Sequence, residues 1–283
     1  MKNLPQALFS RADESPDSTA ARYKFKDRWF EVSWLKLKNR TEILALALRA
    51  LGVEHGDRVA ILSETRLEWW ITDLAILGAG FVGVPVYPDI SKEEMAYILN
   101  DSKARILILE NQTSINKWKS LCKQCPNVEK VVVMEAISNK DEEILSWQEF
   151  LELGEDQLEK EPEFYQKSVS ALKASDLATL VYTSGTTGAP KGVVLTHEQI
   201  FSEVTDLFSA LPVNEQDETL SFLPYSHVMG RVESWGSVWV GYVLNFAESI
   251  DQLSKNIKET RPTVLIGVPR IFEKIHSQIR DRM

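Results

Sequence analysis

The chain has 283 residues, a formal net charge of −9 and 44% hydrophobic residues. This length is enough for one large domain or two smaller ones with a substantial core. The acidic balance lacks the basic footprint of a nucleic-acid-binding protein. Two cysteines fit a reducing compartment, the N-terminus lacks a signal-peptide core, and no apolar run reaches membrane-spanning length. We therefore expect a cytoplasmic globular protein without a nucleic-acid partner.

Residues 1–54 are predicted to form an N-terminal hairpin and helix. Aromatic and β-branched residues recur from Arg22 to Trp34, which is typical of two paired strands. Lys26 and Asp27 are the expected turn. Ser33 is the expected cap of a long helix that ends at Gly52.

Residues 55–140 are predicted to form a first α/β half. Apolar runs of strand length at 58–62, 81–87, 105–109 and 128–134 alternate with segments of helical pattern. This order predicts parallel βαβ units. The same half holds Cys122 and Cys125, an isolated C-x-x-C. Because no further His or Cys pair lies nearby, we expect a structural role for these cysteines and no metal site.

Residues 141–175 are interpreted as a charged connector. The stretch 140–163 contains ten acidic and two basic residues, which favours a solvated face, with a short helix at 146–153. Residues 176–283 are predicted to form a second α/β half. Its expected strands are 177–182, 193–195, 221–223 and 263–267, and its expected last helix is 271–283. Thr196 and Gln199 have the spacing of a capping box for a helix reaching about residue 210.

A ten-residue loop from Thr183 to Gly192 stands between the strands 177–182 and 193–195. It contains three glycines, which let backbone N–H groups approach a ligand. Hydroxyl side chains and a lysine add further donors for phosphate oxygens. The spacing is not that of a Walker loop, because Pro190 precedes Lys191. The loop therefore predicts a phosphate-binding site, with a flexible linker as the alternative.

A second group of candidate residues follows the strand 221–223. His227 comes soon after Leu223 and Pro224, at the end of a strand where ligands lie in open α/β sheets. Considered alone, a histidine in this position is also compatible with a purely structural role.

The segment from Tyr182 to Gly192 resembles the phosphate-loop signature of the adenylate-forming superfamily. This superfamily includes acyl-CoA synthetases, luciferases and peptide-synthetase adenylation domains. The segments 227–231 and 267–274 are similar to those of long-chain fatty-acyl-CoA synthetases. The resemblance implies the AMP-binding domain of such an enzyme, with two doubly wound αβαβα-type subdomains that are incomplete at the C-terminus. Some bacterial members have a gating tryptophan where this sequence has Arg231, so no tryptophan gate is expected there.

The resemblance also implies a two-step reaction. A fatty-acid carboxylate attacks the α-phosphorus of ATP to give acyl-AMP and pyrophosphate, and coenzyme A then displaces AMP. Mg²⁺ is expected on the phosphates. Lys191, His227 and Thr187 are the expected catalytic residues. The expected nucleotide-binding residues are Thr183, Ser184, Gly185, Thr186, Thr187, Gly188, Lys191 and Gly192. The expected substrate-binding residues are His227, Arg231, Gly267 and Pro269. A lipid substrate is also compatible with peripheral contact at the inner face of a membrane.

Several segments of the family pattern are missing from this sequence. We find no Tyr-Gly-x-Thr-Glu for the adenine and metal site, no Thr-Gly-Asp for the ribose, and no small C-terminal domain with its adenylation lysine. One explanation is that the chain is part of a longer acyl-CoA ligase and is inactive alone. The alternatives are a short non-catalytic protein that binds nucleotide or a partner, and an adenylation domain for another carboxylate such as an amino acid. The sequence predicts neither the acyl chain length nor the oligomeric state.

Overall fold

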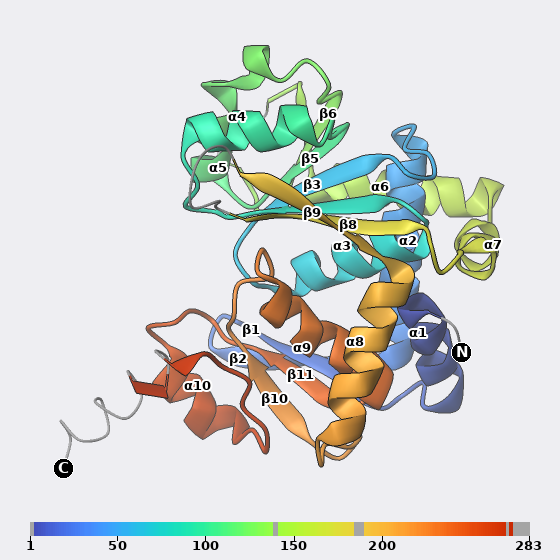
Figure 1. Ribbon diagram of the computed structural model, residues 1–283, viewed down its shortest axis with the longest axis vertical. Helices are drawn as coiled ribbons and strands as arrows, with labels where there is room; N and C mark the ends of the chain where they lie inside the picture. Colours follow the sequence, from blue (N-terminus) through green and yellow to red (C-terminus); the bar gives the residue numbers. More distant parts are fainter. Residues whose placement is uncertain (1–2, 138–140, 184–189, 270–271, 274–283) are drawn as a thin grey trace.

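The computed structural model describes residues 3–137, 141–183, 190–269 and 272–273. The elements stack in layers (Figure 1). From top to bottom the view passes outer helices, the large sheet, a central layer of helices and the small sheet, with the last helix to the left of the small sheet. The structure is the mixed α/β fold expected from the sequence, with largely parallel sheets flanked by helices.

The large sheet has seven strands in the order β7-β6-β5-β3-β4-β8-β9. All neighbours are parallel except β8 and β9, which are antiparallel. The order confirms the predicted parallel units in the first half. The strands are β3 Arg58–Leu62, β4 Val82–Val86, β5 Ile106–Leu109, β6 Lys130–Val133, β7 Ile144–Ser146, β8 Leu177–Thr183 and β9 Lys191–Thr196.

The small sheet has four strands in the order β10-β11-β1-β2. Its strands come from both ends of the described chain. The predicted N-terminal hairpin forms β1 and β2, and β1 pairs in parallel with β11. The strands are β1 Thr19–Phe25, β2 Arg28–Ser33, β10 Glu218–Ser221 and β11 Val243–Phe246.

The helices fall into an outer pair, a central group and one isolated helix. The outer pair is α4 Lys92–Asp101 and α5 Gln112–Lys119. The central group is α1 Leu4–Glu14, α2 Trp34–Ala50, α3 Leu67–Gly78, α6 Trp147–Lys160, α7 Phe164–Ala171, α8 His197–Ala210 and α9 Val228–Val240. The isolated helix is α10 Leu253–Thr260, and a single 3₁₀ turn spans Cys122–Gln124.

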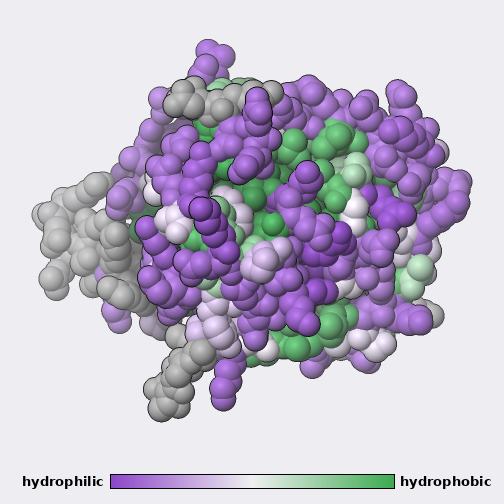
Figure 2. Space-filling model, turned by 90° about the horizontal axis from the view of Figure 1, so that it is seen from above, coloured by the Kyte–Doolittle hydropathy of each residue, from purple (hydrophilic) through white to green (hydrophobic). Residues whose placement is uncertain are grey.

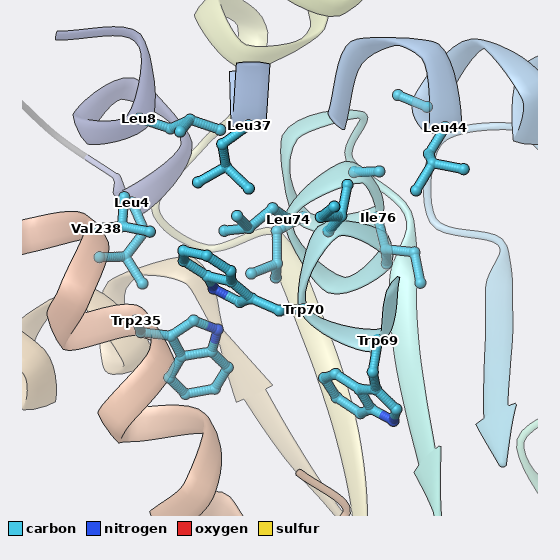
Figure 3. Close-up of a cluster of buried hydrophobic side chains, with 14 of the residues drawn as sticks. Leu4, Leu8, Leu37, Leu44, Trp69, Trp70, Leu74, Ile76, Trp235 and Val238 are labelled. Carbon is cyan, nitrogen blue, oxygen red and sulfur yellow. The ribbon is translucent and has the colours of Figure 1, made fainter. Parts of the chain in front are cut away.

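Each space between layers holds its own apolar core. The largest core lies between the two sheets and contains buried side chains of the central helices. Trp70 and Trp235 approach each other there from α3 and α9, with Trp69 beside them (Figure 3). A second core lies under α4 and α5, and a small third core lies under α10. Trp69 and Trp70, adjacent in the sequence, are both almost fully buried.

Local signals in the sequence account for most helix starts and turns. Ser33, Ser91 and Thr196 accept hydrogen bonds from backbone N–H groups at the starts of α2, α4 and α8, which satisfies donors that a helix start leaves free. Lys26 and Asp27 adopt positive φ at the predicted turn, as a two-residue hairpin requires. The predicted caps at Ser33 and Thr196 and the predicted turn are confirmed.

The sheets group the strands differently from the two expected halves. The strand 177–183, expected to begin the second half, pairs with β4 of the large sheet. The N-terminal hairpin, expected in a separate region, pairs with β11 of the small sheet. An apolar run indicates burial but does not name the strand it pairs with, so long-range packing decides these partners.

Two further expectations are wrong in detail. The region 141–175 is ordered rather than a bare connector: it supplies β7, α6 and α7, and Phe150, Tyr165 and Val169 join the central core. The run 263–267 is no strand, because Val264 alone forms a bridge, with Thr219, and its neighbours are not fully buried. Most of the expected last helix, 271–283, falls outside the described residues.

The surface seen from above is mainly hydrophilic, with hydrophobic side chains visible near its centre (Figure 2). Such a mixture is normal for a folded globular protein. Among the described residues, no helix combines the length and apolar character needed to cross a membrane.

Candidate nucleotide and acyl site

The neck of the predicted phosphate loop is formed by the hairpin β8–β9. Thr183 pairs directly with Lys191, and Tyr182 pairs with Gly192. Both strands therefore extend further than the sequence predicts, and Thr183, Lys191 and Gly192 lie in the ladder. Lys191 thus lies at the base of the loop, at an exposed position. Ser184, Gly185, Thr186, Thr187 and Gly188 lie outside the described residues.

Close packing against the Tyr182 ring explains why a glycine stands at position 192. A Cβ at this position would lie 3.1 Å from Cζ of the Tyr182 ring, closer than an ordinary contact. The Tyr182 hydroxyl donates a 2.6 Å hydrogen bond to Oδ2 of Asp101 in α4. Burial and the Asp101 carboxylate raise the pKa of Tyr182, so this phenol stays neutral. The hairpin is therefore tied to the outer helix layer next to the loop.

A cleft of about 490 Å³ lies beside this neck. Its walls come from β8, from Pro190 before β9, from the start of α9 and from the segment after β4. The lining side chains are Tyr87, Asp89, Ile90, Glu94, Ile98, Val181, Tyr182, Thr183, Pro190, His227 and Val228. The cleft thus brings together the two motifs that the sequence analysis identified, although 44 residues of chain separate Thr183 from His227 (227 − 183).

His227 is the N-cap of α9 and is exposed at the cleft. Its Nδ1 accepts a hydrogen bond from the backbone N–H of Met229 at 3.2 Å. The other ring nitrogen, Nε2, is therefore the one left to contact a ligand. The loop before it is held by Thr65, whose Oγ1 donates to the carbonyl of Leu223 and accepts from the N–H of Tyr225.

Arg231 lies one helical turn after His227 but has 0% exposure. Its Nη2 and Nε donate to the two carboxylate oxygens of Asp73, and its Nη1 donates to Oγ1 of Thr179. The guanidinium also lies 4.5 Å from the ring centroid of Trp235. Arg231 is not among the residues that line the cleft, so contact between Arg231 and substrate stays a prediction.

The other predicted substrate residues lie away from this cleft. Gly267 is half-buried beside Phe222 and Phe272, and Pro269 is exposed. Neither is among the residues that line the cleft. Their proposed contact with an acyl chain therefore stays a prediction.

The sequence analysis missed the wall formed by Tyr87, Asp89 and Ile90. These residues directly follow the buried strand β4, and the carboxyl ends of parallel strands are where ligands bind in such sheets. Burial and the neighbouring Asp89 raise the pKa of Tyr87. The position of Tyr87 after an apolar run was the available signal.

The expected structural role of the C-x-x-C pair fits its surroundings. Cys122 and Cys125 are free thiols, and Cys125 is buried. Burial raises the pKa of the Cys125 thiol, which makes it a poor thiolate at neutral pH. Within the described part of the chain, no cluster of three or more His, Cys, Asp or Glu side chains could hold a metal ion.

The fold and this site define an α/β protein in which the hairpin β8–β9 and the start of α9 line one cleft. The sequence profile of AMP-binding enzymes matches residues 8–282. The chain therefore belongs to the AMP-binding enzyme family.

Relatives and solved structures agree with this assignment. The chain is 32% identical over 277 residues to the long-chain-fatty-acid–CoA ligase FadD15 of Mycobacterium bovis, covering 97% of this chain and 45% of that protein. It is 33% identical over 242 residues to the human long-chain-fatty-acid–CoA ligase ACSBG2, covering 83% of this chain and 36% of that protein. The chain thus spans less than half the length of these relatives.

The fold matches the inhibitor-bound crystal structure of the N-terminal domain of FACL13 from Mycobacterium tuberculosis. The TM-score is 0.81 at 26% sequence identity, and the match covers 96% of this chain and 64% of that chain. This likeness supports an N-terminal acyl-CoA synthetase fold for the described residues.

Proposed function

We propose that this chain provides the triphosphate-binding and acyl-facing walls for ATP-dependent activation of a long-chain fatty acid, first to acyl-AMP and then to acyl-CoA. One observation carries the proposal: Thr183 at the neck of the phosphate loop and His227 at the start of α9 line one cleft. The reacting carboxylate and the α-phosphate of ATP must meet, so the groups that hold them have to share one space. The names of the relatives support a fatty acid as the substrate class.

The chemistry needs groups that accept developing negative charge. As the carboxylate oxygen bonds to the α-phosphorus, the bond to the β-phosphate oxygen breaks and charge moves onto pyrophosphate. Lys191, at the neck of the loop, would stabilise that charge as an electrostatic clamp rather than as a base. Thr183 and the loop residues are proposed as further hydrogen-bond donors. His227 would contact the acyl-adenylate through the ring nitrogen that faces the cleft.

Magnesium fits this site as a nucleotide-borne ion. Mg²⁺ keeps several waters and is usually bound through phosphates plus one or two carboxylates. Asp89 and Glu94 line the cleft, while the described residues supply no larger carboxylate cluster. The ion, when bound, would neutralise phosphate charge, and Asp89 is the residue we propose to face it.

The first experiment measures binding of MgATP to the chain by calorimetric titration. The second measures exchange of labelled pyrophosphate into ATP in a ligase containing this chain, with palmitate or with an amino acid as acceptor. We expect MgATP binding, and exchange that depends on palmitate. No detectable binding of MgATP would contradict the proposal, and exchange with the amino acid alone would favour an amino-acid adenylation domain.

A further inference from the structure

A buried polar network joins four elements: α3, α9, β8 and β4. Asp73 on α3 binds Arg231 on α9 through two hydrogen bonds, at 2.5 and 3.3 Å. Arg231 donates at 2.7 Å to the hydroxyl of Thr179 on β8, and that hydroxyl donates at 2.7 Å to the carbonyl of Gly83 on β4. The side chains of Asp73, Arg231 and Thr179 are at most 1% exposed.

The geometry of this network is restrictive. A guanidinium that binds a carboxylate with two donors has one favoured orientation. Trp235 narrows it further, because its ring stacks on the guanidinium and its Nε1 donates to Oδ2 of Asp73 at 2.9 Å. The guanidinium is therefore held in one place by hydrogen bonds at its edge and an aromatic ring on its face.

On α9, β8 and β4, the residue in the network lies four positions in the sequence from a residue that lines the cleft. Arg231 follows His227 by one helical turn. Thr179 precedes Thr183 along β8, and Gly83 precedes Tyr87 along β4. His227, Thr183 and Tyr87 line three different walls of the cleft. One buried centre thus connects the acyl-side motif, the root of the phosphate loop and the segment after β4.

The two strands lie side by side, but their hydrogen-bonded ladder at this point is short. The ladder between β4 and β8 consists of a single pair, Gly83 with Thr179. The side-chain bond from the Thr179 hydroxyl to the Gly83 carbonyl adds to it. The Thr179 hydroxyl therefore adds a side-chain hydrogen bond to a short backbone ladder.

Building on the proposed function, we infer that Asp73, Arg231 and Thr179 are positioning residues that set the spacing of the three cleft walls. Arg231 acts through His227 and the loop root rather than by touching the substrate. The network holds the acyl-side histidine at a constant distance from the groups that bind the triphosphate. Small displacements of reacting groups lower rates strongly, about 100-fold for 1 Å, so this spacing matters for adenylate formation.

The test compares Thr179→Val with Thr72→Val. Thr179→Val removes the bridging hydroxyl but keeps the ion pair and the shape of the side chain. Thr72 is also fully buried, next to Asp73, but its hydroxyl donates only to the carbonyl of Glu68 in its own helix. Thr72→Val therefore removes a buried hydroxyl without touching the network. Thr179→Ser keeps the hydroxyl and is the rescue variant.

The readout is a distance measured without any ligand. Spin labels are attached at Met229→Cys on α9 and Val194→Cys on β9, both exposed positions, after Cys122 and Cys125 are replaced by alanine. Pulsed electron resonance then reports the distance distribution between the labels. We expect it to broaden or shift in Thr179→Val and to match the parent in Thr72→Val and Thr179→Ser. In a ligase containing this chain, adenylate formation should fall about 10- to 100-fold in Thr179→Val alone.

An unchanged distance distribution in folded Thr179→Val would overturn the inference. A hydroxyl that only stabilises the fold would lower the melting temperature when removed, but it would not change the distance between α9 and β9. If Thr179→Val does not fold, the paired replacement Asp73→Asn with Arg231→Met takes its place, because removing both charges of a buried pair is better tolerated than removing one. The same shift or broadening is expected there. Binding of MgATP by the parent chain tests the proposed function separately from this distance.

Discussion

His227 and Arg231 lie one turn apart at the start of α9 and face opposite environments. His227 is exposed at the cleft, whereas Arg231 is fully buried against Asp73 and Thr179. One helix start therefore holds an exposed histidine at the cleft and a buried arginine behind it. This division of roles explains how a solvent-exposed histidine can keep a constant position.

Replacing Lys191 with alanine is expected to weaken binding of MgATP to the chain about 10- to 100-fold. A hydrogen bond that involves a charged group contributes about 1.5–3 kcal/mol, and Lys191 stands at the neck of the loop opposite Thr183. Calorimetric titration measures the effect. Lys36→Ala, at an exposed position on α2, is the control and should bind like the parent. Equal affinities in Lys191→Ala and the parent would remove the clamp role.

His197 makes the fold sensitive to acid. Burial, with a smaller contribution from His55, lowers the pKa of His197 to about 4, and Asp176 partly opposes this. Its ordinary value is 6.5. Between these values the unfolded chain binds the proton and the folded chain does not, so stability falls as pH falls. The loss approaches about 3 kcal/mol at pH 4.

Urea unfolding at several pH values tests this prediction. His197→Gln should lose less stability than the parent between pH 6.5 and pH 4. His55→Gln, at a position whose side chain is 64% exposed, should behave nearly like the parent. A parent and a His197→Gln variant with parallel pH profiles would show that the buried imidazole does not control this range.

Glu233 gives the stability of the fold a pH dependence opposite to that given by His197. Burial raises the pKa of Glu233 to about 7, against hydrogen bonds that lower it, and its ordinary value is 4.5. The folded chain therefore holds a proton that the unfolded chain releases, so stability is full below pH 4.5 and is lost as pH rises through 7. The loss amounts to about 3 kcal/mol.

Glu233→Gln keeps the neutral shape at every pH. Its free energy of unfolding, relative to the parent, should rise between pH 5 and pH 8. The exposed Glu198→Gln on α8 is the control and should show no such trend. If Glu233→Gln and the parent differ by the same amount at both pH values, the carboxyl is ionised in the folded chain.

Gly154 lies on α6 where this helix packs closely against α2, and replacing it with alanine tests that packing. A Cβ at this position would lie 2.2 Å from the backbone carbonyl oxygen of Ile43, and a backbone atom cannot turn aside. Gly154→Ala should therefore cost about 1–3 kcal/mol of stability or more. Glu155→Ala, one residue on and exposed, should change stability by less than about 0.5 kcal/mol. Similar melting temperatures for the two variants would contradict the packing.

The local structure could be predicted because its causes are local. A serine or threonine followed three residues later by Glu or Gln is a local signal for the start of a helix. The apolar runs of β3 and β5 indicate burial by composition alone. The phosphate loop was recognisable for a similar reason, since hydroxyls, glycines and a lysine within ten residues already describe the chemistry. His227 could be suggested from its place after a strand end.

The burial of Arg231 could not be predicted in the same way. Its partners Asp73 and Thr179 are 158 and 52 residues away in the sequence, and no local pattern links them. The wall at Tyr87 and Asp89 was missed because its residues carry no motif. The sequence of region 141–175 predicts a solvated connector because charged residues dominate its composition. The few apolar residues that pack it against the core, such as Phe150, give no periodic pattern that stands out among them.

The sequence by itself determined the family, the capped helices and the hairpin turn, and it predicts the phosphate-loop chemistry, because each depends on neighbours within a few residues. The tertiary structure alone decided which strands share a sheet, that Thr183 and His227 face one cleft, and that Arg231 is an anchor rather than an exposed group. These features depend on contacts between distant segments, where the free energy of burying shared surface, rather than any local preference, selects the partner.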